Sequence, residues 1–146
     1  MITEKASEND VFILEHLERL CFSSPISKDM LLRMIKADDS VILTAKEGPE
    51  GNILGYGGFQ YVLDEGYIFN IAVFEEHRRK HAGKCIMEGL EEKARALGLS
   101  FLTLEVRQSN LPAIGLYSSM GYTEAGRRKG YYTLPKEDAV IMTKTF

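Results

Sequence analysis

Apolar and polar positions alternate with the period of an α-helix over the first part of the chain. From residue 9 to residue 21 the apolar positions lie three to four residues apart, which predicts an amphipathic helix. Ser27 can cap a second helix, whose apolar side contains Leu31 and Met34. The chain therefore begins with two helices that each need a surface to pack against.

The pattern then changes to that of extended chain. Segments 41–46, 53–63 and 67–74 are rich in β-branched and aromatic residues and are separated by turn residues, which predicts three consecutive strands. The third segment is apolar enough to predict burial on both of its faces. Inside the second segment, the pair Gly57 and Gly58 indicates a bulge or a close approach of another part of the chain.

Helical and extended patterns alternate in the second half. An apolar stripe predicts a long helix over residues 83–97, which Gly98 can end. The order of elements indicates a mixed sheet with helices packed on it, an α/β or α+β fold. The remaining expected elements are a strand at 101–106, a short helix at 113–120, and strands near 122–125 and 139–145.

Composition places the chain among ordinary globular proteins. It has 146 residues, of which 45% are hydrophobic and 27% are charged, and this predicts one domain over residues 1–146. The formal net charge is -3, whereas a general binder of nucleic acid is more often basic. We therefore expect no direct nucleic-acid partner.

Targeting, disulfide and metal signals are also missing from the sequence. The first ten residues are charged and lack an apolar stretch, which argues against a signal peptide, and no stretch approaches the ~20 apolar residues of a membrane helix. Cys21 and Cys85 form no C-x-x-C pair, and His16, His77 and His81 lack the spacing of metal ligands. We expect a cytoplasmic protein without a metal and without a membrane partner.

A basic segment precedes the long helix. Arg78, Arg79, Lys80 and Lys84 lie around the expected N-terminus of that helix, where unpaired N–H groups favour an anion. This combination predicts a phosphate or pyrophosphate site, with a solvated basic loop as the alternative. The patterns G-x-x-x-x-G-K-[ST] and G-x-G-x-x-G are absent, so neither of those nucleotide-binding loops is present.

Two side chains further along can transfer protons. Glu105 lies near the carboxyl end of an apolar strand, where open sheets bind ligands, and partial burial would raise its pKa toward that of a general base. The alternative is a solvated Glu105 paired with Arg107 or with a helix end. Tyr117, a phenol of ordinary pKa ~10, can protonate a leaving thiolate, or can simply pack in the helix that contains it.

Other reactive or polar positions have simpler interpretations. Cys85 is a rival nucleophile, since the thiol pKa falls near a helix N-terminus, but a small core residue is the more usual role. The basic run 127–129 is interpreted as a solvated face. Tyr131 and Tyr132 beside it can line an acceptor groove. Tyr67 can do the same, although packing in the core is the favoured interpretation.

These segments, in this order, resemble the GCN5-related N-acetyltransferase (GNAT) superfamily. The family's phosphate loop has the pattern R/Q-x-x-G-x-G/A, and residues 78–83 follow it, except that His81 replaces the central glycine. The blocks VLDEGYIFNIAV, LEVRQSNLPAIGLY, GY, RRKGYY and EDAVIM resemble the bacterial ribosomal-protein-alanine N-acetyltransferase branch over residues 10–143. The resemblance implies a mostly antiparallel sheet of about six to seven strands with helices on both faces.

The resemblance implies acetyl-CoA as the acetyl donor. A strand would hold its pantetheine arm, and backbone N–H groups of the basic loop would bind its pyrophosphate. The residues that the resemblance assigns to the cofactor are Ile71, Ala72, Val73, Arg78, Arg79, Lys80, His81, Ala82, Gly83, Lys84 and Asn110. Asn110 can also cap the helix that follows it.

The resemblance also implies the chemistry and the acceptor. Glu105 would be the base that deprotonates an amine, and Tyr117 the acid that protonates the departing thiolate, in a direct transfer within a ternary complex. The acceptor would be the N-terminal α-amine of a protein, an alanine-starting small-subunit ribosomal protein. The alternatives are a protein lysine or small-molecule amine as acceptor, and a non-catalytic acyl-CoA-binding module. A monomer or weak dimer is expected.

Overall fold

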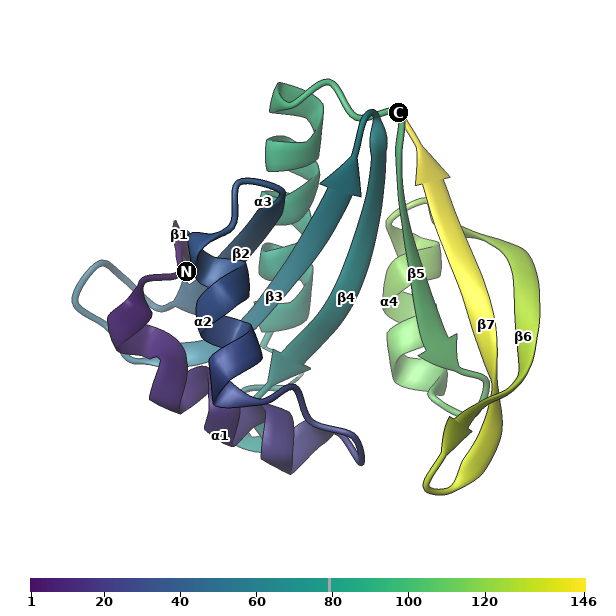
Figure 1. The fold of residues 1–146 in the computed structure, drawn as a ribbon, viewed down its shortest axis with the longest axis horizontal. Helices are drawn as coiled ribbons and strands as arrows, with labels where there is room; N and C mark the ends of the chain where they lie inside the picture. Colours follow the sequence, from purple (N-terminus) through teal and green to yellow (C-terminus); the bar gives the residue numbers. More distant parts are fainter. Residues whose placement is uncertain (79) are drawn as a thin grey trace.

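The computed structural model describes residues 1–78 and 80–146, and within them seven strands form one sheet (Figure 1). The strands are β1 Ile2–Lys5, β2 Ser40–Lys46, β3 Ile53–Val62, β4 Glu65–Val73, β5 Phe101–Arg107, β6 Thr123–Thr133 and β7 Lys136–Thr145. The helices are α1 Val11–Cys21, α2 Lys28–Lys36, α3 Ala82–Ala96 and α4 Leu111–Ser119, with 3-10 turns η1 Glu8–Asp10 and η2 Glu75–His77.

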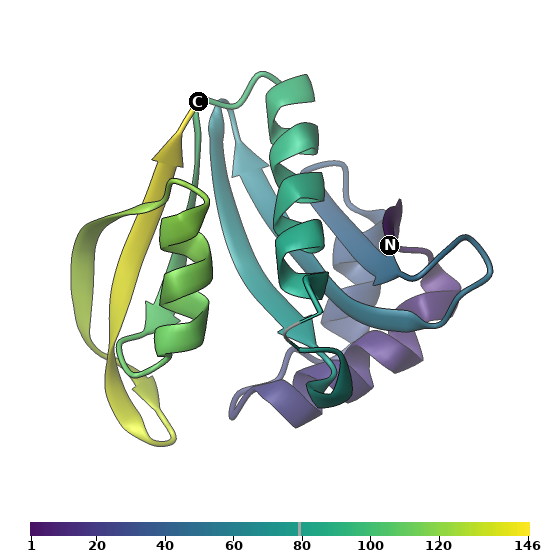
Figure 2. The ribbon, with the colours of Figure 1, turned by 180° about the vertical axis from the view of Figure 1, so that it is seen from behind.

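The strand order is β1-β2-β3-β4-β5-β7-β6. Every neighbouring pair is antiparallel except β4 and β5, which are parallel. Helices α1 and α2 cover one face, and α3 and α4 cover the other (Figures 1 and 2). The expected fold, a mixed and mostly antiparallel sheet with helices on both faces, is confirmed.

Each face of the sheet has its own apolar core. Leu14 and Leu17 of α1 pack with Tyr56 on one face, whereas Ile86 and Leu90 of α3 belong to the core on the other. All five side chains are fully buried. The four helix positions are among those that the helical spacing predicted as apolar, so local pattern and tertiary packing agree at these positions.

Glycine allows a close contact between β3 and α3. A Cβ on Gly57 would lie 2.5 Å from Cδ1 of Ile71 and 2.6 Å from Cγ2 of Ile86, so a larger residue would push the two elements apart. The pairing of β3 with β4 shifts register between Gly58 and Phe59, which confirms the predicted bulge.

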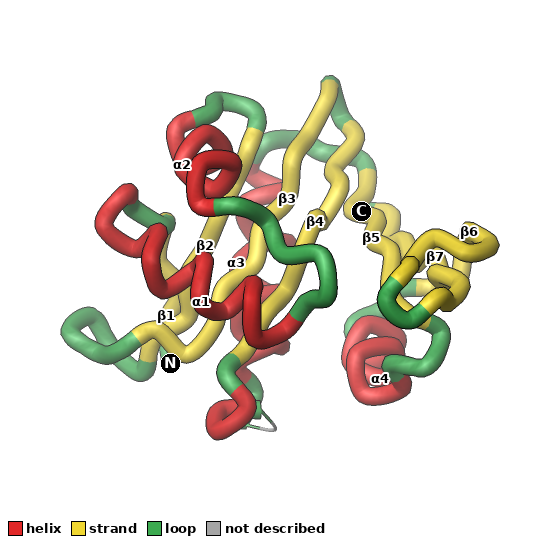
Figure 3. Tube along the Cα trace, turned by 60° about the horizontal axis from the view of Figure 1, so that its bottom comes forward, coloured by secondary structure: helices red, strands yellow, loops and turns green. Residues whose placement is uncertain are grey.

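The sheet splits between β4 and β5. The two strands pair only over residues 65–67 and 101–103, and Figure 3 shows β5, β7, β6 and α4 set apart from the rest of the sheet. Beyond residue 67, the edge of β4 on this side therefore has no hydrogen-bonded partner strand among the described residues. The prediction that this strand is buried on both faces was wrong, because Tyr67 is 43% exposed and Phe69 is only partly buried.

Two further elements differ from the sequence prediction. Strand β1 was not predicted, since four residues carry little pattern and the strand is held by pairing with β2, where Lys46 Nζ lies 2.9 Å from Glu4 Oε2. The final hairpin is longer than predicted. Its strand β6 is an edge strand whose polar residues are largely exposed, so most of its length lacks the apolar alternation from which a strand is predicted. In the described part of the chain, no helix is both long and apolar enough to cross a membrane.

Candidate active site

The split between β4 and β5 forms a cleft of about 570 Å³. Two walls face each other across it. The β4 wall is residues 68–71, and beyond the lining of the cleft it continues into Val73 and the N-terminus of α3. The β5 wall is residues 104–107 together with Tyr117 and residues 131–134. The residues that line the cleft are Cys21, Phe22, Ser23, Ser24, Ile68, Phe69, Asn70, Ile71, Leu104, Glu105, Val106, Arg107, Asn110, Tyr117, Tyr131, Tyr132, Thr133 and Leu134. The cleft therefore brings together segments that lie far apart in the sequence.

The backbone of β4 presents polar groups to the cleft. The N–H of Phe74 donates to Leu54 O in β3 at 3.0 Å, so the backbone groups of Val73, one residue earlier, face the other way. In agreement, Val73 O accepts from Arg78 Nε at 3.2 Å and from Sγ of Cys21, which lines the cleft. Ile71, two residues before Val73, shares this orientation, whereas the side chain of Ala72 is buried.

The N-terminus of α3 follows directly after this strand. His81 caps α3 with φ of 66°, a left-handed conformation that a glycine adopts with less strain. The N–H groups of Ala82, Gly83 and Lys84 are in the first turn, where helices leave donors without helical partners. Lys80 is exposed beside them.

One of the expected cations of this loop also contacts the protein. Arg78 is exposed, but its guanidinium donates to Val73 O and lies 3.6 Å from Cys21 Sγ, so it supports the end of β4. Lys84 is half-exposed and lies 3.9 Å from Glu88. Arg79, also expected to contact the cofactor, lies outside the described residues.

Glu105 lies on the half-exposed face of β5, as the strand alternation predicts. Its side chain is 28% exposed, and Arg128 Nε donates to its Oε1 at 3.0 Å. The alternative prediction that Glu105 pairs with Arg107 was wrong, because Arg107 pairs with Glu137 instead. Residues 127–129 are exposed, as predicted for a solvated face, and the 55% exposed side chain of Arg128 also pairs with Glu105. Strand order explains both, since β6 lies beside β7 and β7 beside β5.

Tyr117 extends from α4 into the same cleft. Its side chain is 7% exposed, and burial, followed by the nearby Tyr132, raises its pKa to about 12. Asn110 places this helix, because its Oδ1 accepts from the N–H of Ala113 at 3.3 Å, which confirms its predicted capping role. The phenol therefore stays protonated over the whole physiological pH range.

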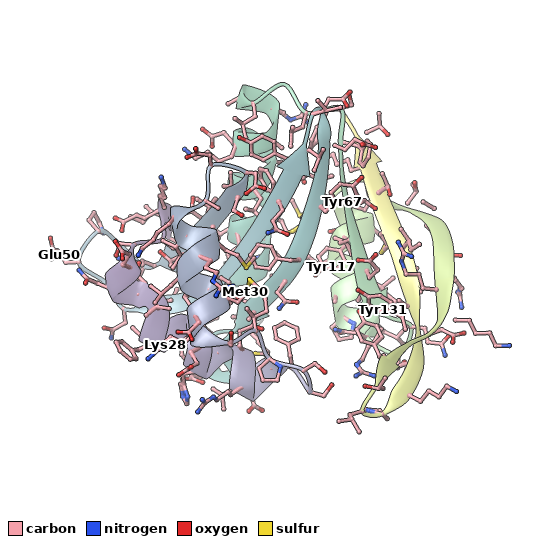
Figure 4. All side chains as sticks on the ribbon, viewed as in Figure 1. Lys28, Met30, Glu50, Tyr67, Tyr117 and Tyr131 are labelled. Carbon is pink, nitrogen blue, oxygen red and sulfur yellow. The ribbon has the colours of Figure 1, made fainter. Side chains whose placement is uncertain are left out.

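Two further tyrosines line the cleft from the hairpin. Figure 4 shows the labelled Tyr117 and Tyr131 beside β5, on the side of the cleft opposite β4. Tyr131 and Tyr132 form an edge-to-face pair with ring centroids 5.1 Å apart, and both line the cleft as predicted. Tyr67 lies elsewhere, half-exposed and edge-on to Phe101, so its predicted place in the core was wrong.

A buried carboxylate behind the β4 wall was not found by sequence reasoning. Glu18 is 0% exposed and accepts hydrogen bonds from Tyr56 Oη, from Asn70 Nδ2 at 2.9 Å and from the N–H of Ile26 at 2.8 Å. Burial raises the pKa of Glu18, although these hydrogen bonds act in the opposite direction. Glu18 occupies an inward position of α1. A charged residue on the apolar stripe of a helix is the sequence signal that could have identified it.

Cys85 does not have the properties of a nucleophile. Burial raises the pKa of its thiol, contrary to the lowered pKa expected near the helix N-terminus. It is also absent from the lining of the cleft. Among the described residues, no group of three or more His, Cys, Asp or Glu side chains is placed to hold a metal ion.

The sequence matches the model of the Acetyltransferase (GNAT) family over residues 11–122. The chain belongs to the GNAT family. Among GNAT proteins it is similar to the [ribosomal protein bS18]-alanine N-acetyltransferase of Escherichia coli strain K12, with 43% identity over 94 residues. That alignment spans 63% of this chain and 64% of the E. coli protein, which is less than two thirds of the length of that relative.

Two other GNAT comparisons cover nearly the whole chain. The [ribosomal protein bS18]-alanine N-acetyltransferase of Haemophilus ducreyi is 36% identical over 142 residues, which is 95% of this chain and 96% of that protein. The crystal structure of the E. coli ribosomal-protein-S18-alanine N-acetyltransferase superposes with a TM-score of 0.86 at 31% identity, over 98% of this chain and 92% of that one. The resemblance inferred from the sequence blocks is confirmed.

Proposed function

We propose that this GNAT protein transfers an acetyl group from acetyl-CoA to the N-terminal α-amine of a protein that begins with alanine, such as a bS18-like ribosomal protein. The observation that carries the proposal is the shared cleft of Glu105 and Tyr117. One is a carboxylate on β5, the other a buried phenol on α4, and both face the open edge of β4. The names of the relatives supply the class of acceptor.

The β4 wall fits the donor. Backbone groups of Ile71 and Val73 that face the cleft can pair with the amides of a pantetheine arm, as in addition of a strand to a sheet edge. The first-turn N–H groups of α3 suit a pyrophosphate, and Lys80 and Lys84 add positive charge there. Asn110 lines the cleft as well as capping α4.

We assign proton removal to Glu105. An α-amine has a pKa of about 7.7–8.0 and is largely protonated at neutral pH, so it must lose a proton before it can attack. Arg128 donates to Oε1 of Glu105, so we assign Oε2 to receive the amine proton, directly or through a water. The N–H of Val73 can donate to the oxyanion that attack creates.

We assign proton donation to Tyr117. The amine nitrogen forms a bond to the acetyl carbonyl carbon, and the bond from that carbon to the CoA sulfur breaks. The phenol proton goes to the sulfur, the nitrogen loses its second proton to solvent as the tetrahedral intermediate collapses to the amide, and the phenolate is reprotonated from solvent. Because burial raises the pKa of Tyr117 to about 12, the donor is fully protonated before each turnover.

The site supports two other functions less well, lysine acetylation and non-catalytic binding of acyl-CoA. A lysine amine has a pKa of about 10.4, so a single carboxylate base deprotonates it less readily near neutral pH than an α-amine. A non-catalytic acyl-CoA-binding module would have no use for Glu105 and Tyr117 in one cleft.

The test is a comparison of initial rates at fixed acetyl-CoA, in which release of the CoA thiol is the measured signal. The acceptors are an alanine-starting peptide, the same peptide with its α-amine blocked and an internal lysine left free, and a phenylalanine-starting variant. We expect the first to be fastest. Equal rates on the blocked peptide would move the assignment to lysine. Stabilisation by acetyl-CoA in thermal melting without thiol release for any amine would favour the binding module.

A further inference from the structure

Arg107, the last residue of β5, connects two segments that line the cleft, the turn between β6 and β7 and the loop between α1 and α2. Its Nη1 donates to Pro135 O at 2.8 Å and its Nη2 to Leu134 O at 3.2 Å, both in the turn between β6 and β7. The same Nη2 donates to Ser23 Oγ at 3.2 Å, in the loop between α1 and α2. Both segments line the cleft.

The hairpin side of this connection is firmly built. Arg107 Nη1 lies 3.2 Å from Glu137 Oε1, and the side chains of these two residues are 22% and 11% exposed. Glu137 is itself fixed, because its Oε2 accepts from the N–H of Ser109 at 2.7 Å. The Arg107 guanidinium also lies 4.3 Å from the centre of the Tyr132 ring.

The loop side rests on two anchors. Glu18 accepts from the N–H of Ile26 beneath the loop, and Arg107 donates to Ser23 across the cleft. Residues 22–24, between these anchors, line the cleft opposite the hairpin turn. The contact between Arg107 and Ser23 thus sets the distance between the loop and the turn.

We propose that Arg107 is a positioning residue that determines how the acceptor's first residue fits. The proposal rests on the proposed function, since it concerns the acceptor end of the same cleft. Arg107 holds residues 22–24 and the turn at Leu134 and Pro135 at a fixed spacing, so a small first side chain is accepted and a large one is excluded. Lysine cannot replace it, because a single ammonium lacks the planar fork that binds several acceptors at once.

The test compares Arg107→Lys, Ser23→Ala and the double variant, with Arg127→Lys as the matched control. Arg127 lies on the same hairpin but binds Glu124 and Gln108 outside the cleft lining, and its side chain is 53% exposed. Initial rates would be measured with alanine- and leucine-starting peptides and with varied acetyl-CoA.

For Arg107→Lys we expect the KM of the alanine peptide to rise about tenfold, as for loss of a charged hydrogen bond, while kcat and the KM of acetyl-CoA change less than about threefold. Ser23→Ala should raise the peptide KM about two- to fivefold and add little to Arg107→Lys, because both substitutions remove the contact between Arg107 and Ser23. The preference for alanine over leucine should fall in both variants but not in Arg127→Lys.

Three results would overturn the role of Arg107. The KM values of both substrates could rise together, the two substitutions could add fully, or the preference for alanine could stay unchanged. If wild-type protein acetylates no N-terminal peptide, the proposed function fails and the role of Arg107 fails with it. If wild-type protein is active and Arg107→Lys behaves like Arg127→Lys, only the role of Arg107 is lost.

Discussion

The two walls of the cleft present different chemical groups, backbone groups on one side and side chains on the other. The β4 wall offers backbone groups, from Val73 at the open strand edge and from the first turn of α3. The β5 wall offers side chains, above all Glu105 and Tyr117. A backbone wall suits a ligand that is always the same, whereas a side-chain wall can be adapted to one reaction and one acceptor.

The charges of the two walls differ in the same way. Behind the β4 wall, Glu18 is fully buried and saturated with donors, so it fixes structure. On the β5 wall, Glu105 is 28% exposed and, within the described part of the chain, accepts a side-chain hydrogen bond only from Arg128 Nε, at 3.0 Å, so it can still meet a substrate. Two glutamates in one molecule thus have opposite roles because their surroundings differ. The predictions below test that division.

The largest effect is expected on the β5 wall. Glu105→Gln should fold and bind acetyl-CoA but lower turnover of an alanine-starting peptide roughly 10²–10⁴-fold, since the amide cannot accept the amine proton. The defect should shrink as pH rises and free amine becomes abundant. Glu124→Gln is the control, because Glu124 is an exposed carboxylate paired with Arg127 on β6. Near-wild-type turnover of Glu105→Gln at pH 7 would remove Glu105 as the base.

Tyr117→Phe should have the next largest effect, about 10- to 100-fold on kcat. The loss is smaller than for Glu105 because a thiol has a pKa near 8.5 and departs partly without an acid. Since burial raises the pKa of Tyr117 to about 12, wild-type kcat should show no alkaline fall up to about pH 10.

The control for this substitution is Tyr122→Phe. Tyr122 packs near Tyr117, with ring centroids 6.1 Å apart, but does not line the cleft. A loss of kcat in Tyr122→Phe equal to that in Tyr117→Phe would point to packing and not to proton donation.

The buried charge behind the β4 wall should affect stability. Burial raises the pKa of Glu18 above its ordinary value, so the folded protein binds a proton more tightly than the unfolded chain. The stability that this proton binding adds is fully present below the pKa of Glu18 in the unfolded chain. It is lost as pH rises through the pKa of Glu18 in the folded protein, with a slope of at most about 1.4 kcal/mol per pH unit.

Chemical denaturation of wild-type protein and of Glu18→Gln across this pH range measures the effect. The glutamine does not titrate, so the difference in unfolding free energy, wild type minus variant, should fall as pH rises above the unfolded value. A difference that rises with pH would mean that hydrogen bonding outweighs burial at this carboxylate.

The smallest effect is expected at the N-terminus of α3. His81→Gly should leave CoA affinity equal or raise it up to about threefold, because glycine adopts the left-handed conformation without strain and has no Cβ near a bound phosphate. Calorimetric titration with CoA decides this. A tenfold loss of affinity would show that the imidazole is itself a ligand of the phosphate.

Most of the fold could be predicted because its elements are locally encoded. The stripe of α3 and the cap at Ser27 depend only on neighbouring residues, and both agree with the structure. Strand β1 was missed because pairing with the distant β2, and not local pattern, makes it extended. Strand β6 was predicted too short because most of its length is polar and exposed and is held extended by pairing with β7. The burial of β4 was mispredicted because the split from β5 depends on topology.

The site could be predicted less completely than the fold. Glu105 and Tyr117, both predicted as site residues, line one cleft. Alternation along the strand and the resemblance pointed to Glu105, and the resemblance pointed to Tyr117. The partners Arg128 of Glu105 and Asn70 of Glu18 were not found, since each pair spans strands or elements far apart in the sequence. Contacts of this kind depend on strand order, which a hydrophobic pattern does not contain.

The division between the two walls is tested most directly by acetyl-CoA affinity in the double variant Glu105→Gln and Tyr117→Phe, measured by calorimetric titration. If the β4 wall binds the donor and the β5 wall performs the chemistry, the dissociation constant should stay within about twofold of wild type while turnover is lost. A tenfold weaker affinity for acetyl-CoA would contradict this account, because the chemical side chains would then also bind the donor.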